Sequence, residues 1–209
     1  MKRVFCNAIT PNPKLKKYNA MNIVDSQDIQ KLTLYLYRND INLEYFIDNE
    51  YYTLLSYACK NGKYKSAQFL LQQPYIDINE RGPLEIACIY NRYEIVNLLL
   101  EQPGLDVNEF RPLSQACRYG HYKIVKLLLK QVAVDVNNFN PLKLACKNRH
   151  YKIVKLLLQQ SGIKIKNHYI IYCVLLKIRA FESIKNFKKS DIKTYCSSWH
   201  VNFFQILEI

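Results

Sequence analysis

Glycine is scarce in this chain, with 5 residues among 209. The glycine-containing signatures that cradle phosphates or expose a catalytic serine do not occur, and neither does the zinc motif H-E-x-x-H. No nucleophile is placed in register with a base. These absences exclude the common enzyme signatures, so we expect a protein that is not an enzyme, with no cofactor and no catalytic site.

Long apolar runs are absent as well, because no stretch reaches the roughly 20 residues that a membrane-spanning helix needs. Too few apolar residues follow Met1, Lys2 and Arg3 to form the core of a signal peptide. We therefore expect residues 1–20 to be a flexible polar leader. We also expect an intracellular protein that is not secreted and has no transmembrane segment.

The chain does contain a repeat with a period of 29 residues. The string Pro-Leu-x-x-Ala-Cys begins at Pro83, Pro112 and Pro141, and a fourth copy, Leu54 to Cys59, precedes them by the same interval. Each copy is followed by a turn and an apolar run, of the I-V-x-L-L-L type in the last three copies, and an Asp-Ile/Val-Asn tripeptide follows three of the runs, at Asp77, Asp106 and Asp135. A fixed period in this range predicts a stacked array, which presents a long surface instead of a pocket.

Each part of the unit favours a pair of short helices. Proline suits the first turn of a helix, and the Leu and Ala-Cys positions that follow it share one helical face. The first helix should end near Gly62, Asn91 and Gly120, which tolerate left-handed dihedrals, whereas Arg149 fits the same position less well. The I-V-x-L-L-L run is apolar on two adjoining faces, as expected of a helix between two neighbours.

This unit resembles the ankyrin repeat. The likeness is carried by P-L-x-x-A-C, by the Y-G-H turn at Tyr119 to His121, by I-V-K-L-L-L from Ile124 and by D-V-N from Asp135. It implies an all-α solenoid of stacked antiparallel helix pairs that binds a protein partner. The threonine before the family's proline and the histidine after its P-L are replaced here, so the hydrogen bonds that they supply between repeats are in doubt.

The period is shorter than the family's 33 residues. Only three residues separate each closing Asn from the next Pro, for example Asn108 from Pro112, which is too few for the family's projecting β-hairpin. The step from Asp40 to Asp77 is 37 residues, and its extra length lies in residues 43–53. This long loop is where we expect a full hairpin.

The register defines the expected domains. After the leader we expect a repeat array over residues 21–167, and a degenerate repeat with a C-terminal cap over 168–209. The array divides into a half-unit at 22–50 and repeats at 51–79, 80–108, 109–137 and 138–166.

Cysteine and histidine recur in register. Cys59, Cys88, Cys117 and Cys146 share one repeat position, and packed helices are about 8–10 Å apart, too far for disulfides. We expect buried thiols in a reducing compartment and no metal site among them. His121 and His150 recur at the turn, which we interpret as a structural position. Cys196 and His200 are spaced like half of a metal site, but no second half is apparent.

Charge is uneven, because residues 111–209 carry 18 Lys and Arg against 4 Asp and Glu, whereas residues 1–110 carry 12 against 13. A solvated outer face in a lysine-rich chain explains this excess without any ligand. The alternative is that the basic half binds nucleic acid or an anionic surface through Lys123, Lys126, Lys152 and Lys155. Neither interleaved aromatic residues nor a known nucleic-acid module supports it in the sequence.

The resemblance implies that exposed positions of the first helices form a concave groove for a protein partner. The candidates in the groove are Tyr57, Lys60, Ile86, Tyr90, Gln115, Arg118, Tyr119 and Lys147. The candidates in the long loop are Tyr45, Phe46, Tyr51 and Tyr52. Tyr and Arg are the residue types that most often dominate interfaces.

Further expectations concern partners and origin. We expect a monomer whose acidic loop and basic end permit weak head-to-tail self-association. A substrate adaptor for a ubiquitin ligase is another alternative, although the tail has no proline after Pro141 and hence no Leu-Pro box signature. The L-L-L-x-Q-P and D-I/V-N strings look most like ankyrin proteins of giant DNA viruses that infect amoebae, which implies a host-directed role in the host cytoplasm or nucleus.

Overall fold

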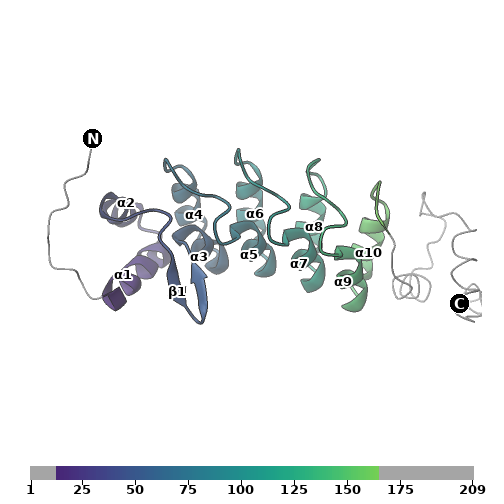
Figure 1. Cartoon of the computed structure of the whole chain (residues 1–209), viewed down its shortest axis with the longest axis horizontal. Helices are drawn as coiled ribbons and strands as arrows, with labels where there is room; N and C mark the ends of the chain where they lie inside the picture. Colours follow the sequence, from purple (N-terminus) through teal and green to yellow (C-terminus); the bar gives the residue numbers. More distant parts are fainter. Residues whose placement is uncertain (1–12, 165–209) are drawn as a thin grey trace, which may run out of the picture. The chain divides into compact units, whose positions relative to one another are not determined.

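The computed structural model describes residues 13–164, which are coloured in Figure 1. The chain divides into two compact units, with unit 1 ending at Pro83 and unit 2 beginning at Leu84. The predicted degenerate repeat and cap at 168–209, with Cys196 and His200, lie outside the described residues. Among the residues that are described, no helix is long and apolar enough to cross a membrane.

Unit 1 contains two helix pairs with a β-hairpin between them (Figure 1). Its elements are α1 (Pro13–Ser26), α2 (Ile29–Arg38), β1 (Tyr45–Ile47), β2 (Glu50–Tyr52), α3 (Leu54–Asn61) and α4 (Tyr64–Leu71). Helix α1 packs on α3 and α2 packs on α4, so the first helices and the second helices form separate layers.

The N-terminal boundary differs from the sequence expectation. Residues 13–20 belong to helix α1, where the sequence predicts a flexible leader, and α1 completes a helix pair where a half-unit is predicted. Ala20, Met21 and Val24 of α1 are buried. The P-L-x-x-A-C string is missing from this helix, and for that reason the repeat register did not identify it.

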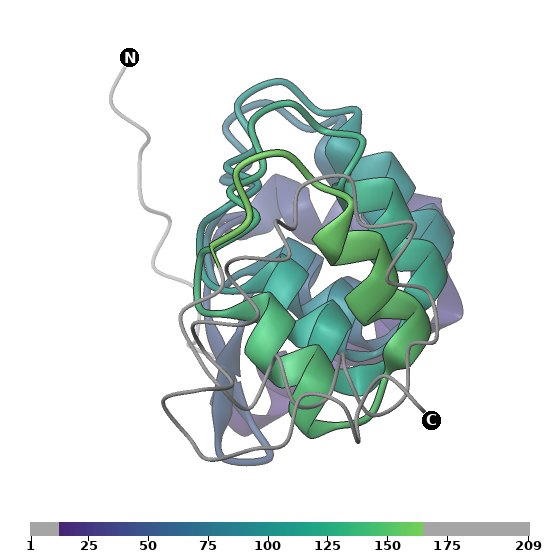
Figure 2. The ribbon, with the colours of Figure 1, turned by 90° about the vertical axis from the view of Figure 1, so that its right-hand side faces the viewer.

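The described part of unit 2, which ends at residue 164, contains three helix pairs. They are α5 (Pro83–Ile89) with α6 (Tyr93–Leu100), α7 (Pro112–Tyr119) with α8 (Tyr122–Leu128), and α9 (Pro141–Lys147) with α10 (Tyr151–Leu158). Helix α7 packs on α9, and α8 packs on both α6 and α10. Figure 2 looks along this stack and shows α9 in front of α7 and α10 in front of α8. The predicted all-α array of stacked helix pairs is confirmed.

The core consists of the repeated apolar positions. Each of the four cysteines is fully buried and forms no disulfide, as predicted. Burial raises the pKa of the Cys59 and Cys117 thiols, because a thiolate would lose its hydration there. The Ile-Val pair and buried leucines complete the interior in α6, α8 and α10, and Ala67, Leu70 and Leu71 do so in α4. Small Ala-Cys residues on one helix therefore allow the next first helix to pack closely.

The turns inside the pairs have the predicted backbone. Gly62, Asn91, Gly120 and Arg149 all have positive φ, between 56° and 80°. Glycine adopts this region without cost, whereas a side chain such as that of Arg149 is strained there. The helix-ending position is thus confirmed in each pair, including the one occupied by arginine.

The linkers between pairs also follow the prediction. The long loop forms the hairpin, in which β1 and β2 pair antiparallel with Tyr45 opposite Tyr52 and Phe46 opposite Tyr51. Within residues 84–164 no strand is present. The three-residue linkers turn instead through residues of positive φ, which are Arg81, Phe110 and Phe139 at the same register position.

Asparagine side chains link successive repeats, a feature that the sequence did not predict. Asn42, Asn108 and Asn137 each place one side-chain amide between two backbone groups of the following loop. Asn108, for example, donates to the Ala133 carbonyl at 2.7 Å and accepts from the Asp135 N–H at 2.8 Å. The asparagine of the Asp-Ile/Val-Asn tripeptide therefore supplies hydrogen bonds between repeats in a chain that lacks the family's threonine and histidine.

Candidate functional site

The hairpin in unit 1 is anchored through one of its faces. Tyr45 is buried, and its hydroxyl lies 2.5 Å from the hydroxyl of Tyr35 on α2. Burial, followed by this hydrogen bond, raises the pKa of Tyr45. Tyr52, the cross-strand neighbour of Tyr45, is also buried and lies on the same face. The two tyrosines fix the hairpin to the helices and are not available to a partner.

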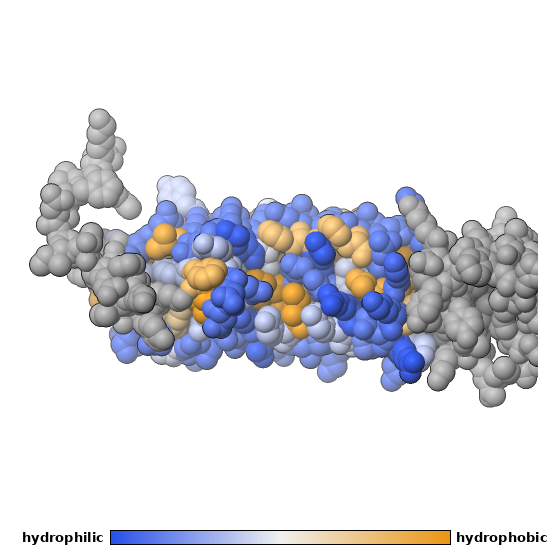
Figure 3. All heavy atoms as spheres, turned by 60° about the horizontal axis from the view of Figure 1, so that its bottom comes forward, coloured by the Kyte–Doolittle hydropathy of each residue, from blue (hydrophilic) through white to orange (hydrophobic). Residues whose placement is uncertain are grey.

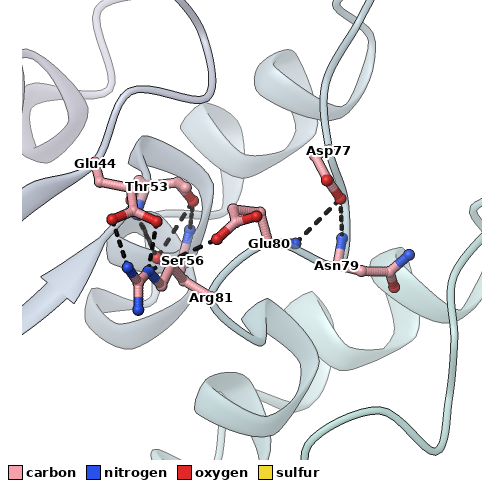
Figure 4. A network of polar contacts seen from close by, with 7 residues as sticks. All are labelled: Glu44, Thr53, Ser56, Asp77, Asn79, Glu80 and Arg81. Carbon is pink, nitrogen blue, oxygen red and sulfur yellow. Dashed lines mark hydrogen bonds and ion pairs between the residues drawn. The ribbon is translucent and has the colours of Figure 1, made fainter.

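Tyr52 connects the hairpin to helix α3. Its hydroxyl donates a hydrogen bond to Glu50 and accepts one of 2.9 Å from the Lys60 ammonium. Burial is the main cause that raises the pKa of Tyr52. Helix α3 then begins with a reciprocal cap, in which Ser56 N–H donates to Thr53 Oγ1 at 3.2 Å and Thr53 N–H donates to Ser56 Oγ at 2.9 Å (Figure 4). The base of the hairpin is therefore tied to the helix that follows it.

The opposite face of the hairpin presents two aromatic rings. Phe46 and Tyr51 are 47% and 52% exposed, and their ring centroids lie 4.9 Å apart. The Arg81 guanidinium lies 5.1 Å from the centroid of the Tyr51 ring. It also donates two hydrogen bonds to the Glu44 carboxylate, one of them 2.6 Å long, and thereby lowers the pKa of Glu44 (Figure 4).

The contacts of Arg81 with Glu44 and Tyr51 could not be predicted from sequence motifs. Arg81 occupies the same linker position as Phe110 and Phe139. The only sequence feature that distinguishes it is a charged residue where the later repeats have phenylalanine. It holds its backbone at φ 59°, which is strained for arginine. The side chain therefore pins the hairpin base from a linker almost forty residues further along the chain.

Acidic residues lie in the hairpin and in the segment that leads into it. Asp40, Asp48 and Glu50 are exposed, and none of them forms an ion pair with any residue in the described range 13–164. No lysine or arginine occurs between Asp40 and Glu50. The hairpin thus carries two preorganised rings on its exposed face, while Glu50 lies on the face of Tyr52 and Asp48 lies in the turn between the strands.

The two groove candidates of unit 1 are engaged inside the unit. The Tyr57 hydroxyl donates to Asp25 at 3.0 Å, and burial together with this carboxylate raises the pKa of Tyr57 to about 12. Lys60 lies 4.6 Å from the centroid of the Tyr52 ring as well as bonding its hydroxyl. Both side chains are half-buried and support the hairpin instead of standing in an open groove.

The candidates of unit 2 fall into two sets. Ile86 and Gln115 are half-buried. Gln115 donates to Glu85 at 3.0 Å, and its Oε1 atom is buried with no hydrogen-bond partner within the described part of the chain. The exposed candidates lie at or near the C-terminal ends of the first helices, and they are Tyr90, Arg118, Tyr119 and Lys147.

The turn histidines have the structural role that was predicted. Nε2 of His121 lies 3.1 Å from the carbonyl oxygen of Ile89, and Nε2 of His150 lies 3.1 Å from that of Arg118. Each ring therefore joins its own turn to the turn of the preceding pair.

The basic candidates Lys123, Lys126, Lys152 and Lys155 are all exposed on the second helices of unit 2. On the face that Figure 3 shows, apolar side chains occur in small separate groups among hydrophilic ones. Within the part of the chain that the structure describes, no cluster of His, Cys, Asp and Glu could hold a metal ion.

Comparison with known families agrees with this architecture. The family model for ankyrin repeats in three copies matches residues 20–111 and 105–168. No curated protein sequence matches the chain. Ankyrin-repeat domains are typically non-enzymatic scaffolds, and no catalytic family is indicated. With most of its length matched, the chain belongs to the ankyrin-repeat family.

Proposed function

We propose that the chain binds a protein partner through the outer face of its 43–53 hairpin. Ankyrin repeats are in general protein–protein interaction modules. The observation that carries the proposal is that the two faces of the hairpin differ. Tyr45 and Tyr52 are buried on one face, whereas Phe46 and Tyr51 are exposed on the other. Aromatic anchors that are held in place before binding lose little conformational freedom on association.

The chemistry of the hairpin defines the partner that it suits. Carboxylates that form no ion pair in the described range, at Asp40, Asp48 and Glu50, favour a segment with lysine or arginine side chains. The rings of Phe46 and Tyr51 offer stacking and cation–π contacts to the same segment. The proposed ligand is therefore a cationic peptide segment that packs an apolar or guanidinium side chain against the exposed surface of the two rings.

Selection of peptides from a random phage-displayed library against the intact chain tests this proposal. We expect enrichment of sequences rich in Arg and Lys, and loss of their binding in the Phe46→Ala, Tyr51→Ala double variant. The matched control is Tyr75→Ala, because Tyr75 of the same unit is 92% exposed and lies outside the hairpin. Circular dichroism checks that each variant keeps its helices.

A second double variant changes the carboxylates and leaves the Phe46 and Tyr51 rings in place. Asp48→Asn with Glu50→Gln removes two carboxylates and should weaken peptide binding most at low salt. Selected peptides without cationic residues, or peptides that bind the ring-deleted variant as well as the original chain, would refute the proposed site.

The likeness to viral ankyrin proteins supports a finer proposal, in which the partner is a host protein inside the infected cell. Buried thiols that form no disulfide suit a reducing compartment. Affinity purification of the intact chain from its host, followed by mass spectrometry, tests this proposal. Recovery that depends on Phe46 and Tyr51 would connect the host partner to the hairpin.

A further inference from the structure

The turns that join the helices of each pair form a continuous edge of unit 2, which we call the turn edge and define as residues 90–94, 118–123 and 148–152. The histidine bonds from His121 to Ile89 and from His150 to Arg118 hold successive turns together. Residues 29 positions apart in the sequence therefore become spatial neighbours along this edge.

Tyrosine recurs along the turn edge. Within residues 84–164, the second helix of each pair begins with tyrosine, at Tyr93, Tyr122 and Tyr151. Tyr90 directly follows α5, and Tyr119 is the last residue of α7. Four of the rings are substantially exposed, with 38% for Tyr93, 40% for Tyr122, 42% for Tyr90 and 47% for Tyr119. The fold thus produces an array of aromatic residues that is not apparent when the sequence is read linearly.

One of these rings is held in a defined orientation. The Tyr119 ring is stacked with the His121 ring, with centroids 6.1 Å apart and planes inclined by 19°. The Arg118 guanidinium lies 5.6 Å from the same tyrosine centroid. Tyr119 therefore presents a preorganised aromatic surface beside a positive charge.

Cations are interleaved with the tyrosines. Arg118, Lys123, Arg149 and Lys152 are exposed, and within residues 13–164 none of the four forms an ion pair. The only carboxylate on the turn edge is that of Glu94. The edge therefore combines a net positive charge with exposed rings, which is the combination that binds single strands in other proteins.

Arg149 adds an independent observation. It has φ 61° at the position where the other turns of unit 2 use Asn91 and Gly120. Arginine is strained in this region, so folding alone favours glycine or asparagine at this position. Position 149 therefore carries an exposed positive charge where asparagine or glycine would fit the backbone better.

We propose that the turn edge binds single-stranded nucleic acid. The phosphates contact Arg118, Lys123, Arg149 and Lys152, while bases that are free of a complementary strand stack on the tyrosine rings. Two repeat steps of about 10 Å each span about 20 Å, roughly six nucleotides at 3.4 Å per nucleotide. A duplex fits the turn edge less well, because its bases are stacked inside the helix and cannot contact the tyrosine rings. An acidic protein would contact only the positive charges.

Titration of the intact chain with fluorescent oligothymidine and oligouridine of about 20 nucleotides, over a series of salt concentrations, tests the proposal. Tyr122→Ala should weaken binding roughly five- to a hundredfold without changing the salt dependence, and Tyr122→Phe should restore it, because stacking needs only the ring. Lys123→Gln and Arg149→Gln should each reduce the slope of log affinity against log salt by about 0.7.

Two control variants distinguish this site from general charge and from the hairpin. Lys130→Gln removes an equal charge at the opposite end of α8 and should leave affinity nearly unchanged. Phe46→Ala with Tyr51→Ala removes the proposed protein site of unit 1 and should not affect oligonucleotide binding. The melting temperature of each variant shows whether it remains folded.

Several outcomes would overturn the proposal. They are equal losses in Lys130→Gln and Lys123→Gln, an unchanged affinity in Tyr122→Ala, and binding of duplex DNA, polyglutamate or anionic vesicles as tight as that of single strands at the same salt. The last result would indicate a charge-only surface for acidic proteins or lipids. Failure of this site leaves the hairpin proposal intact, because the two sites share no residue.

Discussion

A Cβ atom at position 120 would lie 2.5 Å from Cε1 of the His150 ring, so the ring of one turn rests directly on the bare backbone of the turn before it. Gly120 also has φ +80°, and the His150 ring places Nε2 3.1 Å from the carbonyl oxygen of Arg118. Glycine is thus required at position 120 for two separate reasons.

Gly120→Ala should lower the free energy of unfolding by more than the strain of a left-handed alanine backbone alone would. A left-handed alanine costs about 1–2 kcal/mol, and displacement of the His150 ring should add about 1 kcal/mol through its lost hydrogen bond. Gly104→Ala is the matched control, because Gly104 has φ +82° and no atom within 4 Å of its would-be Cβ. Urea unfolding of both variants measures the difference, and equal losses would contradict the packing role of His150.

Asn108→Asp should disrupt the link between successive loops of unit 2. The substitution removes the donor to the Ala133 carbonyl and places a carboxylate oxygen against it, at a cost of about 1–3 kcal/mol. Asn148→Asp serves as control, because the exposed Asn148 amide donates to the Leu144 carbonyl of the helix that Asn148 itself caps, and not to another repeat. Comparison of the free energies of unfolding checks the prediction, and a larger loss at position 148 would contradict it.

Alkaline pH should destabilise unit 1 through Tyr57. The pKa of Tyr57 is raised to about 12 in the folded chain, above the usual value of 10, so folding favours the neutral phenol. Its contribution to stability is fully present below pH 10 and is lost as the pH rises from about 10 to about 12. Tyr57→Phe should flatten the fall of the melting temperature in this window. Tyr75→Phe, at a position 92% exposed, should not.

Glu44 and Arg81 should be energetically coupled. A double-mutant cycle with Glu44→Gln and Arg81→Gln should give a favourable coupling energy that shrinks as salt screens the pair. Arg81→Lys should lose most of this coupling, because lysine cannot form the two-pronged contact with the carboxylate. Zero coupling at low salt would show that the pair does not hold the hairpin.

The sequence alone predicted the repeated parts of this molecule. Cys117 in the core and Gly120 at the turn follow from a short periodic pattern whose physical causes are local, and the hairpin at 43–53 follows from the one longer step in that pattern. Helix α1 escaped prediction because its contacts with α3 are tertiary and its sequence lacks the motif. Local periodicity therefore identifies repeated units but not an atypical first one.

The candidate sites were less predictable for the same reason. Tyr45 and Phe46 are adjacent aromatic residues, and only the register of the hairpin shows that one is buried and the other exposed. Arg81 reaches Glu44 because the linker folds back on the hairpin, which no local pattern specifies. The interleaving of Arg149 with tyrosines of neighbouring turns likewise arises only when repeats stack.

The four buried cysteines give the chain a built-in measure of local opening. Cys59, Cys88, Cys117 and Cys146 occupy the same position in successive repeats and are shielded from solvent in the folded state. A thiol reagent can reach each sulfur only when its own repeat opens, so labelling rates resolved by mass spectrometry would rank the repeats by the free energy of that opening. The same residues that let the helices pack closely would then record which repeat opens first.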